Sequence, residues 1–413
     1  HFEVGFHLRT LCRLFANSPK KWTLTLKHSI MKTYFITLSP LDAYFFGGDI
    51  TFDSGEKKNY FVRSEVFPQQ TSILGMLRYQ ILVKRNLLSP IPNSKDLINA
   101  KKKVGGESFT AGSDMPQSFG YIESISPIFL YHKSDKKPYF IAPLDTFISE
   151  NKDYKIFPRK SRASFFTLKN ETVNPLYELL GTSGDDETPY SSKYELRKGF
   201  VSTDQSFSLE ADLFINDERV GIIKEGTLRS NKDEGYYRQV YKRMKDTDLC
   251  FAFYVRLKDG HGITSEEVFL GAERSMFYLN IDEHTSPNTP IEDVFETLLK
   301  ANFKDDSIPE YHKVILLSPA RVDLETMSKH LVAGIYEQVT HRFIQTNLGK
   351  TTKWVIFKKG KSTDEAALTK SERQHLLSTG SVLFVKKSNL NALLETLNNP
   401  GFKKIGYNYY HVL

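Results

Sequence analysis

Several stretches of this sequence combine glycine, arginine and aromatic side chains, a combination that favours contact with a ribose-phosphate chain. They run over 68–78, 218–243 and 269–275, with two short pieces at 380–382 and 405–410. Aromatic rings stack on unpaired bases, cations pair with phosphates, and glycine lets a backbone amide approach a phosphate closely. A capped helix, a strand with a basic face or a plain glycine turn explains each stretch taken alone.

Three of these stretches place a cation where a phosphate would be held. At 68–78, the free N–H groups of a helix N-terminus lie beside Arg78, one turn further on. In the second, Arg219-Val220-Gly221-Ile222 leads to the run from Tyr236 to Arg243, where aromatic residues alternate with cations. In the third, amides of a glycine loop would cradle a phosphate that Arg274 neutralises.

Several catalytic motifs are incomplete in this sequence. Gly349-Lys350-Thr351 resembles the end of a phosphate-binding loop, but the glycine expected five residues before Gly349 is Ile344. Phe46-Gly47-Gly48-Asp49-Ile50 lacks the second acidic residue of a polymerase metal pair. The histidines have no metal-ligand spacing to one another or to cysteine. We therefore predict no catalytic residue, metal or cofactor, with His375 and His411 as the remaining candidates for acid-base chemistry.

Length and composition indicate a globular protein of two domains. The chain has 413 residues, which is more than a single domain of roughly 150 to 200 residues. Of these residues 40% are hydrophobic and 25% are charged, as in a globular protein. No stretch approaches the roughly 18 apolar residues of a membrane helix, and no secretory signal is present. Cys12 and Cys250 are too far apart to form a metal or redox pair. We expect a cytoplasmic protein without membrane contact.

The net charge of +7 is weaker support for RNA binding than it first suggests. Residues 1–30 carry five basic residues and one acidic residue, so they supply +4 and leave +3 for the rest. Local basic runs remain at Lys152–Arg162 and Lys350–Lys361. Such runs are usually solvated faces.

The periodicity predicts an extension followed by an N-terminal unit. Residues 1–30 precede the first methionine and read as an extension outside the fold. A strand at Thr33–Ser39 and a helix from Thr71 follow, and Gly75 inside that helix suggests close backbone approach. Polar stretches read as long loops, and further strands lie between them. The predicted loops are Asn93–Ser118 and Gly181–Tyr194, and the predicted strands are Ile122–Tyr131 and Pro138–Pro143.

A second unit is predicted from a strand at Leu249–Leu257. Its helices start at Thr289 and Ser388. Strands alternate with them at Val314–Leu317, Trp354–Phe357 and Ser381–Val385. Strand, helix, strand, strand, helix, strand is the ferredoxin-like order. The prediction is thus an α+β protein of two ferredoxin-like (RRM-like) domains with long loop insertions, at 31–245 and 246–413.

The motifs occur in an order that resembles one protein family. The strand with Pro40 and Asp42 is followed by Pro-x-x-Thr-x-x-x-Gly-x-x-Arg at 68–78, Arg-x-Gly-Ile at 219–222 and Leu-Gly-x-Glu-Arg at 270–274. Gly-Ser-Val and a closing Gly-Tyr-Asn complete the set. Together they resemble the third Cmr subunit of type III-B CRISPR effectors, in the RAMP superfamily, over about residues 31–413. Residues 1–30 have no counterpart in it.

The resemblance implies a non-catalytic subunit that binds the 5′ tag of the CRISPR RNA in antiviral defence. It implies packing against the large polymerase-like subunit and the backbone subunit, with target RNA contacted indirectly. Carried over to this sequence, RNA binding falls on Arg78, Arg219, Lys224, Arg238, Lys242, Arg243, Gly271 and Arg274. Ala272 stands where the family often has a second glycine, so this loop would approach phosphate less closely.

Two other functions use the same residues differently. A RAMP-type endoribonuclease that processes CRISPR RNA precursors would need a histidine near the ribose 2′-OH, and the glycine and arginine stretches contain none. A protein-only structural adaptor would use its basic runs as solvated faces. RNA cleavage by histidine variants tests the first alternative, and crosslinking through the guide tests the second.

Overall fold

The structure, a computed structural model, describes residues 30–48, 61–88, 94–106, 108–111, 116–148, 154–156, 182–183, 188–189, 199–204, 206–225, 230–271, 273–300, 303, 311–346 and 368–413. They contain both helices and mainly antiparallel sheets, so the α+β class is confirmed. The helices are α2 (Gln70–Lys84), α3 (Ser94–Val104), α5 (Glu210–Leu213), α6 (Ile291–Lys300), α7 (Leu324–Ser328), η2 (Lys387–Asn389), α8 (Leu390–Leu397) and α9 (Pro400–Lys403). None of these helices is long and apolar enough to cross a membrane.

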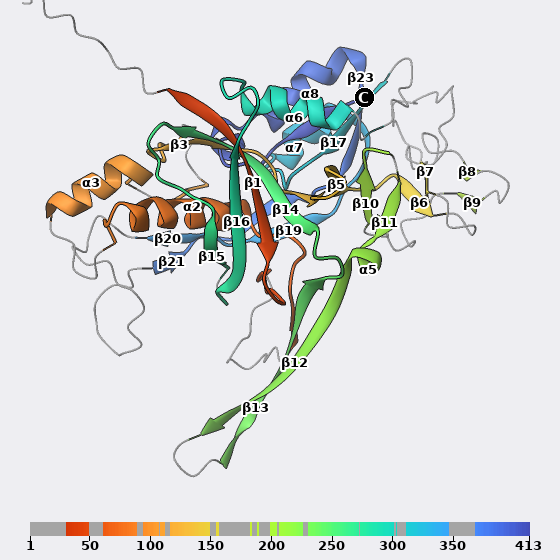
Figure 1. Cartoon of the computed structure of the whole chain (residues 1–413). Coiled ribbons are helices and arrows are strands. Elements are labelled where there is room, and N and C mark those ends of the chain that lie inside the picture. Colours follow the sequence, from red (N-terminus) through yellow and green to blue (C-terminus); the bar gives the residue numbers. More distant parts are fainter. Residues whose placement is uncertain are drawn as a thin grey trace, which may run out of the picture. The chain divides into compact units, whose positions relative to one another are not determined.

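The largest sheet among the described residues has nine strands (Figure 1). β1 (Met31–Pro40) lies between β14 (Leu249–Lys258) and β16 (Ser275–Glu283), antiparallel to both. β15 (Glu266–Leu270) forms the edge beyond β16. Beyond β14 lie, in order, β4 (Phe129–His132), β5 (Lys137–Ile141), β10 (Gly199–Ser202) and β11 (Phe207–Leu209), and β3 (Ile122–Ile125) also pairs with β14.

Alternate residues of the central strands pack on opposite faces of this sheet. Ile36 and Leu38 of β1 join a core that includes α2, whereas Phe35 packs on a second core with α6. This is the period-2 alternation expected of a strand buried on both sides. In α2 the predicted apolar positions Leu74, Leu77, Ile81 and Leu82 are all buried.

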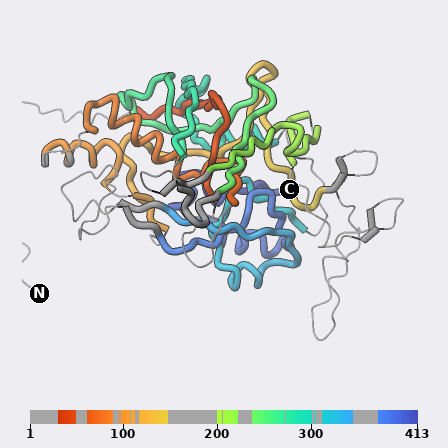
Figure 2. Tube along the Cα trace, turned by 90° about the horizontal axis from the view of Figure 1, so that it is seen from below, coloured from red at the N-terminus to blue at the C-terminus, as the bar shows by residue number. Residues whose placement is uncertain are grey.

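The C-terminal residues form a four-stranded sheet. Its spatial order is β18 (Leu331–Ile335), β23 (Val382–Lys386), β17 (Tyr311–Leu316) and β24 (Tyr410–Val412), with every neighbouring pair antiparallel. Residues from α7 and α8 supply its core. In Figure 2 these residues, coloured blue, gather on one side.

A long antiparallel hairpin leaves the main sheet (Figure 1). It is formed by β12 (Phe214–Glu225) and β13 (Ser230–Met244), and the short β2 (Phe61–Arg63) pairs with β13. The remaining strands are paired two by two: β19 (Gln338–His341) with β22 (Gln374–Leu377), β20 (Ile344–Thr346) with β21 (Leu368–Lys370), β6 (Thr146–Ile148) with β7 (Tyr154–Ile156), and β8 (Thr182–Ser183) with β9 (Thr188–Pro189).

Three local predictions are wrong. Residues 94–104 form α3 rather than a loop, because Ala100 and Val104 bury one side of this lysine-rich helix. Gly75 is exposed, and nothing lies within 4 Å of an ideal Cβ there, so no backbone approaches it. The strand expected at Ile122–Tyr131 is two strands, because Ser126 between them bonds to the Tyr254 backbone through its amide and hydroxyl.

The predicted second unit is arranged differently from expectation. Its first strand, β14, pairs with β1 in the largest sheet, so strands from both sides of the predicted boundary at 245/246 share one sheet. The helix expected from Thr289 begins at Ile291. The strand expected at Trp354–Phe357 lies outside the described residues, as do the side chains of both basic runs. The division into 31–245 and 246–413 stays a prediction.

Candidate nucleic-acid interface

The register of the β12–β13 hairpin sorts the predicted cations onto two faces. Residues opposite each other in an antiparallel pair share a face, and neighbours along a strand alternate. Arg219 is opposite Gln239 and Ile215 is opposite Arg243, so the two arginines share one face. We call this the Arg219 face. Arg238 and Lys242 lie on the other.

The Arg219 face carries two half-exposed arginines, Arg219 and Arg243. The guanidinium carbon of Arg219 lies 4.0 Å from the ring centre of Tyr241, and Arg219 Nη2 lies 3.1 Å from Asp217 Oδ2. Arg243 Nη2 lies 2.9 Å from Asp42 Oδ1. Because exposed ion pairs contribute only about 0 to 1 kcal/mol, a phosphate can replace these carboxylates at modest cost.

The turn between β15 and β16 is joined to this face through Phe45. The rings of Phe45 and Tyr241 are 5.4 Å apart, and the amide of Phe45 donates to Ser275 Oγ at 3.0 Å. Burial raises the pKa of Tyr241, and the carboxylate of Glu273 in the turn raises it further. The glycine turn predicted from sequence and the Arg219 face are therefore neighbours.

Both predicted residues of that turn adopt left-handed backbone conformations. Gly271 has φ +79°, and a Cβ there would lie 3.1 Å from the carbonyl oxygen of Phe45. Arg274 has φ +53°, and its guanidinium lies 4.8 Å from the ring centre of Phe269. Glycine is therefore required at 271 both by its φ and by close approach to Phe45.

Gly221 has a packing role within the hairpin. A Cβ at this position would lie 2.1 Å from the Tyr237 ring, its partner on the opposite strand. The absent side chain lets the Tyr237 ring lie across β12. This places a second tyrosine on the Arg219 face, four residues before Tyr241 on β13.

Arg238 and Lys242, on the other face, are held by acidic residues. Arg238 pairs with Glu218, and its guanidinium lies 5.2 Å from the Phe61 ring centre. Lys242 is buried, pairs with Glu210 and contacts Asn216 Oδ1 at 3.3 Å. Because Lys242 is buried and paired, it stabilises the base of the hairpin. It cannot contact an RNA strand that lies on the Arg219 face.

Arg78 lies away from the hairpin. Its Nη2 donates to the carbonyl of Gly105, after α3, at 3.3 Å, and burial lowers its pKa to about 10. The first turn of α2 is also covered, because Gln70 is buried and a Cβ on Gly406 would lie 2.8 Å from its side chain. The expected phosphate position at this helix N-terminus is instead filled by the chain's own C-terminal turn.

Two predicted features are described only in part. Lys224 belongs to β12 and pairs in register with Asn231, while its side chain lies outside the described residues. Ala272 also lies outside them.

The two candidate histidines lie in the C-terminal half of the chain, away from the Arg219 face in sequence and element. His375 is exposed on β22, with Nδ1 3.3 Å from the hydroxyl of Thr340. Burial lowers the pKa of His411, on β24. The two belong to different sheets.

Sequence reasoning named Asp42 only as part of a motif and missed its pairing with Arg243. It also missed Asp217 and the linking residue Phe45. The alternation of residues along β13 was the available signal, since it separates Arg243 from Arg238 and Lys242. Strand alternation does not locate Phe45, because its contacts Tyr241 and Ser275 are 196 and 230 positions away in the sequence.

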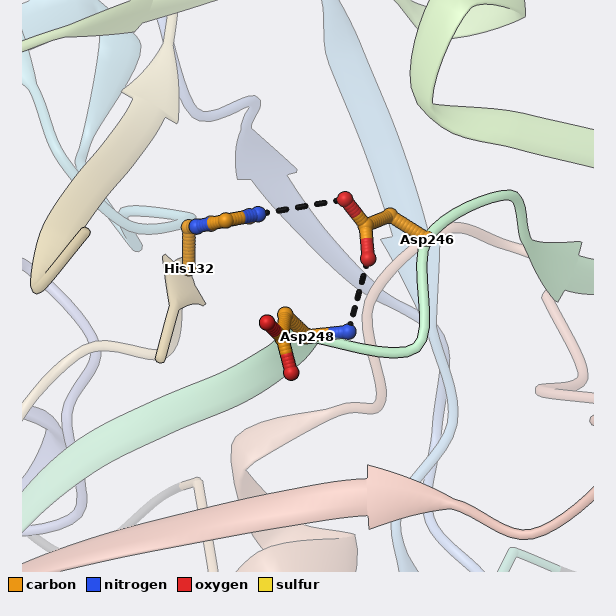
Figure 3. Close-up of side chains that lie close together, drawn as sticks. All are labelled: His132, Asp246 and Asp248. Carbon is orange, nitrogen blue, oxygen red and sulfur yellow. Dashed lines mark hydrogen bonds and ion pairs between the residues drawn. The ribbon is translucent and has the colours of Figure 1, made fainter. Parts of the chain in front are cut away.

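One group among the described residues has the composition of a metal site. It comprises His132, Asp246 and Asp248, and their ligand atoms lie within 4.8 Å of one another (Figure 3). It belongs to neither face of the hairpin.

Comparison with known proteins gives a family match. The model of the family described as "CRISPR-associated protein (Cas_Cmr3)" matches residues 36–413. No curated protein matches the chain.

Solved structures add weaker likenesses. A chain of the "Cryo-EM structure of the Type III-B Cmr-beta bound to cognate target RNA" is 17% identical, with 92% of this chain and 96% of that chain covered and a TM-score of 0.42. A chain of the same complex bound to cognate target RNA and AMPPnP, state 1, is 16% identical, with coverage of 91% and 95% and a TM-score of 0.42. Likenesses at this level carry no argument about fold or function.

Proposed function

This chain belongs to the Cas_Cmr3 family of CRISPR-associated proteins, and we propose that it binds the 5′ tag of the CRISPR RNA in a type III-B effector. In this role it is a non-catalytic subunit that bridges the large polymerase-like subunit to the backbone filament. The family match confirms the resemblance found in the motifs. The tag contact and the bridging role are the proposal.

The observation that carries the proposal is the meeting of Arg219, Arg243 and Tyr241 with the Gly271–Arg274 turn around Phe45. Cations beside exposed or half-buried aromatic rings are the groups that bind single-stranded RNA, by ion pairing and stacking. Each stacked base contributes about 1 to 3 kcal/mol. The proposal therefore rests on Arg219, Arg243, Gly271 and Arg274, and less on Arg78, Arg238 and Lys242.

The two-unit architecture is part of the same proposal. In the C-terminal sheet, the strands taken in chain order β17, β18, β23, β24 have the spatial order 2-3-1-4, with α7 and α8 in the two crossovers. In the large sheet, β1, β4, β14 and β16 have the same order, with α2 after β1. Both arrangements support ferredoxin-like units.

Exposed apolar side chains support packing against another subunit. Leu41, Phe269, Met276 and Tyr278 are 42–51% exposed. Phe269 pairs with Met276 in the β15–β16 register, and the amide of Leu41 donates to Met276. Clustered exposed apolar residues at a sheet edge are typical of an interface.

Photo-crosslinking in the assembled effector tests the proposal. Guides carrying 4-thiouridine at single tag positions would be irradiated, and adducts on this chain mapped by mass spectrometry. Adducts on peptides containing Tyr241 or Phe269 support the proposal. Absence of adducts on this chain supports the adaptor, and adducts confined to peptides outside the hairpin and the β15–β16 turn place the RNA elsewhere.

A further inference from the structure

His132 is held between two carboxylates at the point where two loops meet. Its Nε2 lies 3.1 Å from Asp246 Oδ2, and its Nδ1 lies 3.1 Å from Asp135 Oδ2. Asp246 lies in the connection from β13 to β14, whereas His132 and Asp135 lie at the β4–β5 turn. His132 is 18% exposed, so the ring is largely shielded while the carboxylates reach solvent.

The third acidic residue, Asp248, lies beside the same pair of side chains. Asp248 lies within 4.8 Å of the ligand atoms of His132 and Asp246, and Figure 3 shows the three side chains together. Its amide donates to Asp246 Oδ1 at 2.8 Å, and its carboxylate accepts from the hydroxyl of Ser134. The backbone between the two aspartates is therefore fixed by the group itself.

The contacts of the imidazole ring have the pattern found around metal-bound histidines. Such a histidine binds the ion through one ring nitrogen and donates the other N–H to a carboxylate, which fixes the tautomer. Here Asp135 supplies that carboxylate at Nδ1, and Nε2 points at Asp246. The amide nitrogen of Asp135 lies 3.4 Å from Nδ1, farther than the Asp135 carboxylate. In the other tautomer, with the proton on Nε2, this amide would donate to Nδ1.

The separation of Nε2 from Asp246 Oδ2 suits a shared ion. Zinc binds imidazole nitrogen and carboxylate oxygen at about 2.0–2.2 Å. Two such ligands at angles between a right angle and the tetrahedral angle are then about 3.0–3.5 Å apart, and the observed separation is 3.1 Å. Asp248, with a carboxylate oxygen within 4.8 Å of the ligand atoms of the other two residues, would be the third ligand.

We propose that His132, Asp246 and Asp248 bind one divalent ion of the zinc class, with Asp135 orienting the imidazole. Imidazole and carboxylate ligands bind an ion in their unprotonated forms, so binding strengthens as pH rises. The ion would fasten the connection that ends the β12–β13 hairpin to the β4–β5 turn. This inference is independent of the proposed RNA contact.

Calorimetric titration of the untagged full-length chain with Zn²⁺ tests the site. The wild-type chain is expected to show one saturable site, and His132→Ala and Asp246→Asn to weaken it at least tenfold. His375→Ala is the matched control, because it removes an exposed histidine outside the group and is expected to bind as the wild type does. His132→Gln, checked by circular dichroism, replaces His132→Ala if that variant does not fold.

Three results would overturn the site. The wild-type chain shows no saturable Zn²⁺ binding, the His132 and Asp246 variants bind as tightly as the wild type, or His375→Ala loses as much affinity as they do. The last two results mean adventitious binding elsewhere.

Discussion

Lys313 Nζ lies 2.7 Å from Asp145 Oδ2, and the two side chains are 1% and 0% exposed. Lys313 is in β17 of the C-terminal sheet, and Asp145 follows β5 of the large sheet. The amide of Leu144 also donates to the carbonyl of Gly380 at 2.8 Å. A buried ion pair and a backbone hydrogen bond therefore join the two sheets at one place.

Lys313→Met is expected to destabilise the chain by about 3–5 kcal/mol, because a buried carboxylate loses its ammonium. Urea unfolding followed by circular dichroism measures the change. Lys300→Met is the matched control, since Lys300 pairs with Glu296 at 3.5 Å on the surface, and its effect should stay below about 1 kcal/mol. Equal effects of the two variants would contradict the buried pair.

Two glycines are expected to respond in opposite directions to alanine. Gly75→Ala should stabilise the chain by up to about 1 kcal/mol, because the helix position is exposed and open. Gly406→Ala should destabilise it, because Gly406 has φ +93° and a Cβ would lie 2.6 Å from the carbonyl oxygen of Ser126. Thermal unfolding of both variants provides the measurement. Loss of stability in Gly75→Ala would show that α2 is not placed as described.

Stability should fall as pH drops below about 6.5, partly because of His261. Burial lowers the pKa of His261 below 6.5, and Arg85 adds to this effect. Its Nδ1 accepts from the amide of Ile263 at 3.0 Å. Below pH 6.5 the histidine takes up a proton in the unfolded chain but not in the folded chain. The free energy of unfolding is therefore full above pH 6.5 and falls as the pH drops toward the lowered pKa of the folded state.

Urea midpoints at pH 7.5, 6.5 and 5.5 check this dependence. His261→Gln should flatten the decline, whereas His375→Gln, at an exposed position, should leave it unchanged. The pKa of His411 is also lowered by burial, so part of the decline should persist. An unaltered pH dependence in His261→Gln would contradict the assignment.

The sequence predicted elements with strong periodicity and missed those set by distant contacts. β1, β14, α2, α6 and β23 were found because their apolar residues repeat at strand or helix spacing. α3 was missed because seven of its eleven residues are polar or charged, and among its described side chains only Ala100 and Val104 are buried. The pairing of β1 with β14 joins residues more than 200 positions apart in the sequence, so no local sequence pattern predicts it.

At the candidate interface, the sequence predicted residue types but not their arrangement in space. Residue types indicated the cations of 218–243 and the glycine turn, but neither the hairpin nor the register that places Arg219 and Arg238 on opposite faces. The closing Gly-Tyr-Asn motif has a structural role instead. The Asn408 amide bonds to the backbone of Arg321 and Leu397, which fixes the C-terminal turn.

The salt dependence of affinity for single-stranded 5′ tag RNA tests the central claim most directly. Each phosphate contact on a single strand contributes about 0.7 to the slope of log affinity against log salt. The double variant Arg219→Ala/Arg243→Ala should reduce that slope by about 1.4, while Arg238→Ala, on the opposite face, should leave it near the wild-type value. An unchanged slope in the double variant, or an equal reduction in Arg238→Ala, would contradict RNA binding by the Arg219 face.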